Sequence, residues 1–275
     1  MAGTVACLCL VTPGLWGKEK ITVEELVASH LDSIGTAEAR ARVESITATG
    51  NGSAIPRIGG SGKLVGSARM LSEPGKSLIY MNFATPDYAE EALLFDGESV
   101  EVGQMSPGQR SPLGNLLKTQ ELPLREGLIG GTLSRDWPFL NLPERDPKLK
   151  YKGLRKLDGV KYHEVEYKAR KGKTDFRIRL YFEQETFRHV LSDYRMSISA
   201  SMGSRPIDSS QQSETRYVLI EEFSDFRQEG GLTLPHKYVI RYTREGNATL
   251  KIDWELELEE FTFNQPLQGA FKIDP

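Results

Sequence analysis

Four histidines, two cysteines and adjacent glutamates such as Glu221-Glu222 and Glu259-Glu260 are the side chains best suited to catalysis or metal binding in this sequence of 275 residues. The histidines, which lack the spacing of metal ligands, are His30, His163, His189 and His236. Neighbouring residues of a strand point to opposite faces, so neither Glu221-Glu222 nor Glu259-Glu260 converges on one substrate, and we expect solvated charges. The sequence therefore predicts no catalytic residue, no metal site and no cofactor.

Two further motifs suggest anion binding but are better explained as turns. The stretch GGSGKL at residues 59–64 resembles a phosphate-binding loop, but Arg57 takes the place of the first glycine and Leu64 that of the Ser/Thr. The basic run KARKGK at residues 168–173 lies in a predicted hairpin turn, where a solvated turn is favoured over an anion contact.

With 35 Lys+Arg against 38 Asp+Glu, the net charge is −3, and we expect no nucleic-acid partner.

The pattern around these residues predicts a mainly β chain with a few helices. Thr22 and Glu25 have capping-box spacing, and apolar residues at helical intervals predict an amphipathic helix over residues 22–35, with His30 packed beside the core. Most of the remaining chain alternates apolar and polar residues as strands do. The predicted strands cover residues 43–50, 63–71, 77–84, 89–95, 98–103, 150–157, 160–169, 174–183, 188–199, 215–226, 233–243 and 248–263. Hairpin turns such as Asp96-Gly97 join them, so we expect a strongly curved antiparallel sheet, an incomplete barrel of about 11–12 strands.

Two of these strands define the apolar face of the sheet. The residues that share this face are Phe176, Ile178, Leu180, Phe182, Leu250, Ile252, Trp254 and Leu256. Alternation alone does not say which face is inside, and a transmembrane barrel would carry its apolar face outward. The amphipathic helix has no use in such a barrel. We therefore expect the apolar face to line the inside of the curve.

Residues 111–140, called the central segment here, interrupt the strand pattern. The segment has no period of two, is rich in leucine and is broken by proline and glycine, which predicts short helical pieces on flexible joints. Its apolar residues, too many to lie in water, include Leu113, Leu117, Leu124, Leu128, Ile129, Trp137 and Phe139. We interpret it as a helical lid over the mouth of the sheet, so that these residues and the apolar face bind a ligand between them. The alternative is a permanently closed plug that leaves no space for a ligand.

The first residues differ from the rest in character. An apolar run, then Pro13-Gly14, then the small residue Gly17 before a cluster of charges is typical of the second half of a secretory signal. We therefore expect a signal-peptide remnant over residues 1–17, a single domain over residues 18–275, and a periplasmic protein.

The cysteines, Cys7 and Cys9, both lie in this leader, so no later thiol is available for a disulfide. A lipid-anchored outer-membrane form through Cys7 is less expected, because Thr4 is a poor residue three places before a lipidated cysteine. No later stretch has the ~20 apolar residues that a membrane-spanning helix needs. Contact with a membrane would be peripheral at most.

The order of elements resembles a known superfamily. The stretches that carry the likeness are HLDSIGTAEARARVESITATGNG, GSARMLSEPGKSLIYMNF, LLFDGESVEV, YFEQETFRHVLSDYR and FSDFRQEGGLTLPHKYVI. They resemble the LolA/LolB-like superfamily of periplasmic lipoprotein carriers, in particular its members labelled outer-membrane lipoprotein-sorting proteins. The resemblance implies a bent, incomplete antiparallel barrel closed by helices, with a hydrophobic cavity for acyl chains. One departure is Glu73-Pro74, where the carriers have a basic residue before proline.

Three hypotheses of function follow. The first is a non-enzymatic binding or carrier protein of the bacterial cell envelope, which holds a lipid, a lipoprotein acyl chain or another apolar ligand under the lid. The second is an envelope sensor or interaction module that signals to a protein partner; its mark would be exposed apolar lid residues. The third, an enzyme, has the least support, because no nucleophile, metal set or converging carboxylate pair is found. We expect the first, as a monomer.

Overall fold

The computed structural model describes residues 21–199 and 214–273, so the expected signal remnant at residues 1–17, with both cysteines, lies outside the described residues. The strands are β1 (Ile46–Ile58), β2 (Leu64–Glu73), β3 (Lys76–Thr85), β4 (Tyr88–Phe95), β5 (Val100–Val102), β6 (Lys148–Leu157), β7 (Val160–Lys168), β8 (Arg177–Glu183), β9 (His189–Ile198), β10 (Thr215–Glu229), β11 (Leu232–Glu245) and β12 (Leu250–Phe263). The helices are α1 (Val23–Ile34), α2 (Ala37–Arg42), α3 (Pro112–Thr119), α4 (Leu122–Arg125), α5 (Leu142–Arg145) and the 3-10 turns η1 (Gly131–Leu133) and η2 (Pro138–Asn141).

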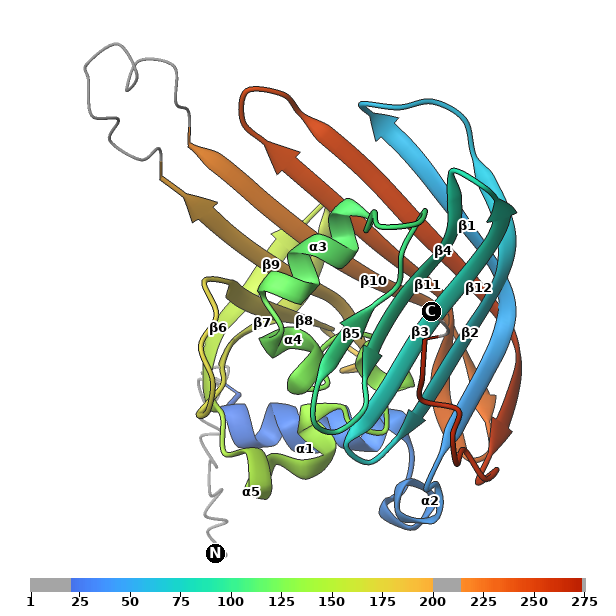
Figure 1. Ribbon diagram of the computed structural model, residues 1–275. Helices are drawn as coiled ribbons and strands as arrows, with labels where there is room; N and C mark the ends of the chain where they lie inside the picture. Colours follow the sequence, from blue (N-terminus) through green and yellow to red (C-terminus); the bar gives the residue numbers. More distant parts are fainter. Residues whose placement is uncertain (1–20, 200–213, 274–275) are drawn as a thin grey trace, which may run out of the picture.

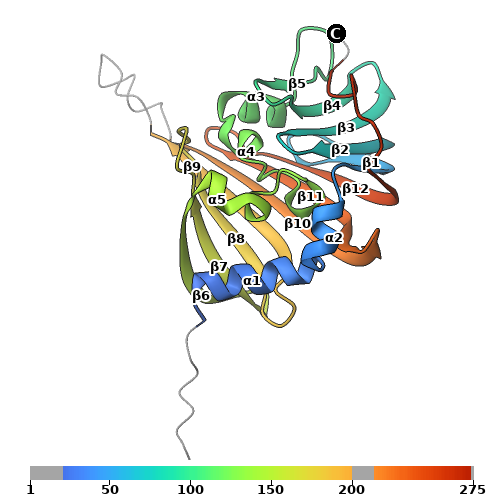
Figure 2. The same ribbon diagram turned by 90° about the horizontal axis from the view of Figure 1, so that it is seen from below.

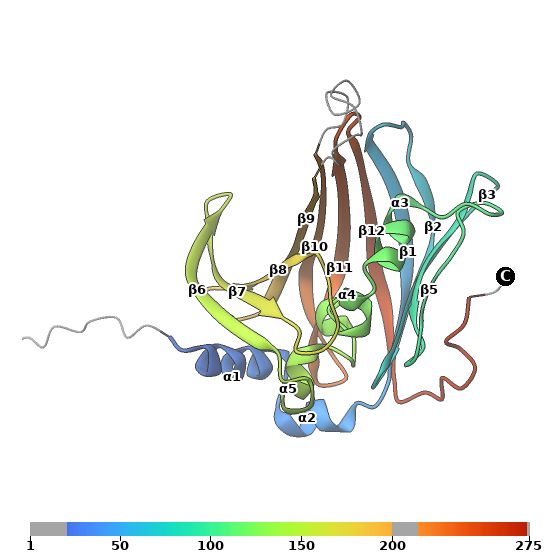
Figure 3. The ribbon, with the colours of Figure 1, turned by 60° about the vertical axis from the view of Figure 1, so that its left-hand side comes forward.

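All twelve of these strands form one antiparallel sheet, which curves strongly without closing (Figures 1 and 3). Its order is β5-β4-β3-β2-β1-β12-β11-β10-β9-β8-β7-β6, so that the first strand pairs with the last and β5 and β6 are the two edges. The fold class predicted from the sequence, a mainly β chain with an incomplete antiparallel barrel and a few helices, is confirmed.

This strand order explains why the central segment leaves the sheet. The segment connects β5 to β6, and these strands lie at opposite edges. The chain between them therefore has to cross from one edge to the other. It does so inside the curve, where α3 and α4 lie between the two arms of the sheet (Figures 1 and 3).

Glycines permit the closest approaches between strands in the curved sheet. At Gly50, where the register of β1 against β12 shifts, a Cβ atom would lie 1.9 Å from the carbonyl oxygen of Glu257. At Gly66 of β2, a Cβ atom would lie 1.7 Å from the carbonyl oxygen of Asn82. Any side chain at either position would push the neighbouring strand away, so this geometry requires glycine there.

Helix α1 crosses one end of the concave side of the sheet (Figure 2). It begins with the predicted capping box, in which the Thr22 side chain accepts from the backbone N–H of Glu25 and the Glu25 carboxylate accepts from that of Thr22. Leu26, His30 and Ile34 form its buried side, whereas Val27 and Leu31 are partly buried. The residues after α1 form the short helix α2, which the sequence analysis did not predict.

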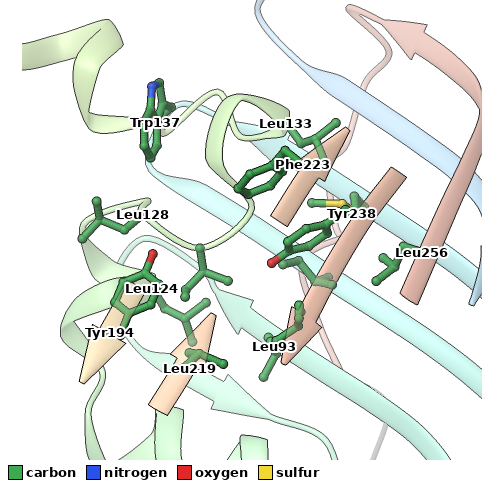
Figure 4. Packing of buried hydrophobic residues seen from close by; sticks show 14 of the residues in the cluster. Leu93, Leu124, Leu128, Leu133, Trp137, Tyr194, Leu219, Phe223, Tyr238 and Leu256 are labelled. Carbon is green, nitrogen blue, oxygen red and sulfur yellow. The ribbon is translucent and has the colours of Figure 1, made fainter. Parts of the chain in front are cut away.

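The apolar face of the sheet lies on the inside of the curve, as expected. Its side chains and those of the central segment form one continuous core. Figure 4 shows Leu124 and Leu128 of the central segment in the same core cluster as Tyr194 and Leu219 of the sheet. The central segment is therefore part of the hydrophobic core in this structure.

Candidate ligand-binding site

Glu221 of β10 holds the middle of the central segment against the sheet. Its carboxylate is completely buried and accepts hydrogen bonds from the backbone N–H of Gly130 at 2.8 Å, the Tyr194 hydroxyl at 2.6 Å and the Tyr238 hydroxyl at 2.5 Å. Burial raises the pKa of Glu221 above its ordinary value, and these donors oppose the rise. The expectation of a solvated charge at Glu221 was therefore wrong, because this side chain lies on the inner face and finds three donors there.

A second tie joins the central segment to α1. The Trp137 indole N–H donates to His30 Nε2 at 3.0 Å, while His30 Nδ1 lies 3.0 Å from the Phe187 carbonyl oxygen. These contacts select the neutral imidazole with its proton on Nδ1. Burial lowers the pKa of His30 to about 4. The Trp137 ring also stacks on His189, with 4.5 Å between the ring centroids.

A third tie fixes the start of α3. Ser111 is the N-cap of this helix, accepting from the backbone N–H of Gly114, and its hydroxyl donates to Glu91 of β4 at 2.8 Å. The Tyr88 hydroxyl also donates to Glu91 and in turn accepts from the Trp254 indole N–H at 2.8 Å. Burial raises the pKa of Glu91 to about 7. This chain of contacts connects the sheet at β12 and β4 to the first turn of α3.

The structure places most of the sequence-predicted ligand residues in the closed core. The seven residues of the central segment are at most 3% exposed: Leu113, Leu117, Leu124, Leu128, Ile129, Trp137 and Phe139. Six residues of the apolar face are at most 7% exposed: Phe176, Ile178, Leu180, Phe182, Trp254 and Leu256. These thirteen side chains pack in one core cluster. Whether they contact a ligand therefore depends on movement of the central segment and stays a prediction.

The remaining two predicted residues, Leu250 and Ile252, line a pocket of about 550 Å³ beside α3. The sheet supplies one wall of this pocket and α3, with the loop before it, supplies another. The lining residues are Ala54, Pro56, Leu64, Tyr88, Met105, Gln109, Arg110, Pro112, Asn115, Leu116, Thr119, Met196, Ile198, Tyr217, Tyr242, Arg244, Leu250 and Ile252. Most are apolar or aromatic.

One face of helix α3 packs in the core and another borders the pocket. Leu113 and Leu117, four residues apart, are completely buried in the core. Pro112, Asn115 and Leu116 lie on the side that borders the pocket. A helix places residues one turn apart on the same side, so this segregation follows from the sequence once α3 is in place. The helix both fills the concave face and bounds the space that remains.

The cross-strand register brings the sheet wall together from distant parts of the chain. Tyr217 of β10 lies opposite Arg244 of β11, and Arg244 lies opposite Leu250 of β12. In the next row, Tyr242 lies opposite Ile252, which lies opposite Pro56 of β1. Only Leu250 and Ile252 were predicted from the sequence, because a local pattern does not show which strands, distant in sequence, lie side by side.

No protein-family model and no curated protein matches the sequence. Among solved structures, a LolA superfamily protein from Nitrosomonas europaea is 14% identical, over 92% of this chain and 98% of that chain, with a TM-score of 0.49. A DUF1329 family protein from Desulfovibrio piger is 11% identical over 88% of this chain and 93% of that chain, with a TM-score of 0.41. A putative outer membrane lipoprotein-sorting protein domain from Vibrio parahaemolyticus is 11% identical over 89% of this chain and 96% of that chain, with a TM-score of 0.40.

The fold resembles that of LolA superfamily proteins, as the sequence suggested. Because every identity is 14% or less and every TM-score lies below 0.5, these structures carry no argument about ligand or partner. In the described part of the chain, none of the helices combines the length and apolar character needed to cross a bilayer.

Proposed function

We propose that this chain is a non-enzymatic binding or carrier protein of the bacterial cell envelope, which holds an apolar ligand in the pocket beside α3. The pocket itself is the observation that carries the proposal. Its volume of about 550 Å³ lies within the range of roughly 300–1,000 Å³ that is usual for small-molecule sites. Its lining has the usual composition too, mainly apolar side chains with a few polar groups.

In this proposal the central segment is a lid of which α3 is the part that meets the ligand. The polar ties through Glu221 and His30 hold the later part of the segment in the core, and the tie through Glu91 holds the first turn of α3 against β4. A long ligand would extend toward Leu113 and Leu117 if α3 lifted from the sheet. The proposal also includes export to the periplasm and a single domain over residues 18–275, as expected from the leader and the uninterrupted sheet.

The sensor alternative has less support. It was expected to expose apolar lid residues to a protein partner, and the seven predicted lid residues are at most 3% exposed. An enzyme also has less support, since the buried carboxylates Glu91 and Glu221 already have donors within the core.

Uptake of a polarity-sensitive fatty-acid probe tests the proposal. The folded wild type is expected to show saturable fluorescence enhancement. Leu64→Trp places a larger side chain in the pocket wall and is expected to weaken probe binding by about tenfold or more, because filled space cannot hold a ligand. Thermal unfolding of each variant checks that the fold is kept.

Val65→Trp is the matched control, because Val65 follows Leu64 on the same strand, is 63% exposed and does not line the pocket. This variant is expected to bind the probe as the wild type does. No uptake by the folded wild type, over several probe chain lengths, would contradict the binding function and leave the central segment as ordinary core.

A further inference from the structure

The pocket beside α3 has an uneven distribution of charge. Two of its lining residues are charged, Arg110 and Arg244, and both are cationic. The lining contains no aspartate or glutamate. The net charge of the whole chain, by contrast, is −3. The pocket is therefore a cationic site on a chain that is acidic overall.

Within the described residues, neither of these guanidinium groups takes part in an ion pair. Other arginines of the sheet do have carboxylate partners. Arg241, three residues before Arg244 on β11, pairs with Glu222 on the outer face, and Arg57 pairs with Asp253 at 2.8 Å. Arg244 lies in phase with Tyr242, so it points to the inner face, where the pocket lining offers no acid.

The register places Arg244 over apolar surface. Its cross-strand neighbours Tyr217 and Leu250 both line the pocket, and the next row toward the core contains Tyr242 and Ile252. Ile252 is 8% exposed, whereas Arg244 is half-buried. We call the row of Tyr242 and Ile252 the apolar floor of the pocket. The polarity of the lining therefore increases from this floor toward Arg244.

Arg110 belongs to the opposite wall. It is exposed and immediately precedes Ser111, the N-cap of α3. Two arginines from separate walls, one on the sheet and one at the start of the helix, thus border the same apolar space. An acyl chain on the floor would leave a negative headgroup next to guanidinium groups, which are good donors to carboxylate and phosphate oxygens.

We propose that the ligand is an anionic amphiphile, with its acyl chain against the apolar floor and its carboxylate or phosphate headgroup bound by Arg110 and Arg244. This inference rests on the proposed binding function and adds the chemical class of the ligand. A free fatty acid and an acidic lipid share this chemistry, and the two headgroups can be separated by experiment.

Calorimetric titration with three amphiphiles of equal chain length tests the proposal: laurate and dodecyl phosphate below their micelle concentrations, and dodecanol below its solubility limit. The wild type is expected to bind at least one of the two anions at least about tenfold more tightly than dodecanol, because charge-assisted hydrogen bonds are stronger than neutral ones. Preference for laurate indicates a fatty acid, and preference for dodecyl phosphate indicates a phosphate-bearing lipid.

The double variant Arg110→Gln/Arg244→Gln is expected to lose this preference and to keep the affinity of the wild type for dodecanol. Arg155→Gln removes an exposed guanidinium of β6 that does not line the pocket, and it is expected to behave as the wild type. Thermal midpoints show whether the variants are folded.

Three results would overturn the inference. Equal affinities of the wild type for laurate, dodecyl phosphate and dodecanol would refute the anionic class but leave the binding function standing. A double variant that also loses dodecanol would show that the arginines shape the pocket and do not select charge. Binding of none of the three by the folded protein would remove the proposed function as well.

Discussion

Glu91 is the residue whose ionisation most directly affects the start of the central segment. Its carboxylate accepts from Ser111, the N-cap of α3, and from Tyr88, while burial raises its pKa from the ordinary 4.5 to about 7. The fold therefore favours the neutral acid over the carboxylate. The resulting stabilisation is complete below pH 4.5 and is lost as the pH rises through 7.

We predict that Glu91→Gln makes the protein less sensitive to alkaline pH. Between about pH 5 and pH 8 the wild type is expected to lose up to about 3 kcal/mol of unfolding free energy from this group, and the variant cannot ionise there. Urea unfolding at four pH values measures the difference between the two proteins. This difference isolates Glu91, because His30, whose lowered pKa acts at acid pH, is present in both.

Glu90→Gln is the control, because Glu90 adjoins Glu91 on β4 and points to the other face of the sheet. Its pH profile is expected to follow that of the wild type closely, because burial is the main cause of the raised pKa of Glu91 and the charge of Glu90 adds least to it. Parallel profiles for the wild type and Glu91→Gln would show that the buried carboxyl is not the source of the pH dependence.

The sequence contained a signal for one of the buried carboxylates. Glu221 is in phase with Leu219 and Phe223, so alternation places it on the apolar face, where a solvated charge is not expected. Its donors could not be predicted, because Tyr194 and Tyr238 come from separate strands and Gly130 from the central segment. Arg244 was not predicted for a similar reason. Alternation along the strand places its side chain on the inner face, but the pocket that it lines forms only when distant strands pair.

The central segment turns at glycines that leave no room for a side chain. Gly127 has φ +66°, and a Cβ atom there would lie 2.0 Å from the carbonyl oxygen of Asp136. The joint expected at Gly127 is therefore a tightly packed turn. Any movement of α3 has to occur without opening the turn at Gly127.

We predict that Gly127→Ala destabilises the protein by about 3 kcal/mol or more, because the left-handed conformation and the clash with Asp136 both oppose a methyl group. Chemical unfolding measures the loss. Gly108→Ala is the control, since Gly108 has φ +75° but no atom within 4 Å of the added Cβ, and about 1 kcal/mol is expected there. Similar losses in both variants would show that close packing at Gly127 contributes little.

The predicted strand bounds were correct where apolar and polar residues alternate clearly. They were wrong where pairing with a distant strand determines how far a strand extends. The positions of β6 to β12 agree with the predicted ranges to within three residues at each end, because their side chains alternate regularly. The predicted first strand ended at Gly50, whereas β1 continues to Ile58. Its second half contains Gly52 and Pro56, poor strand residues, and is held by pairing with β12. Pairing of this kind cannot be read from local sequence.

At the scale of the whole molecule, the strand order determines where a ligand site can form. Since β5 and β6 are opposite edges, their connection has to cross the curve. The core forms where the leucines of the central segment contact the sheet, and the pocket lies beside α3. The central segment has the close packing expected of a plug, and its movement as a lid stays a prediction.

The same strand order leaves β6 with an unpaired long side, and this has a consequence for self-association. An exposed strand edge can accept a strand from another copy, and lysines on the edge oppose this. Lys148 and Lys150 both lie on β6 and are exposed, and Lys148 faces Lys168 across the strand pair. Like charges directly opposite one another destabilise a strand pair. The fold therefore keeps Lys148 opposite Lys168 in spite of their repulsion.

We predict that Lys148→Thr/Lys150→Thr turns the expected monomer into a species that associates as concentration rises, because the edge of β6 then lacks the charges that keep a second copy away. Light scattering during size-exclusion chromatography over a concentration series measures the mass. Lys171→Thr/Lys173→Thr changes the net charge equally in the turn after β7 and is expected to stay monomeric. If the β6 variant stays monomeric at every concentration, the lysines are not what limits growth of this sheet by addition of further copies.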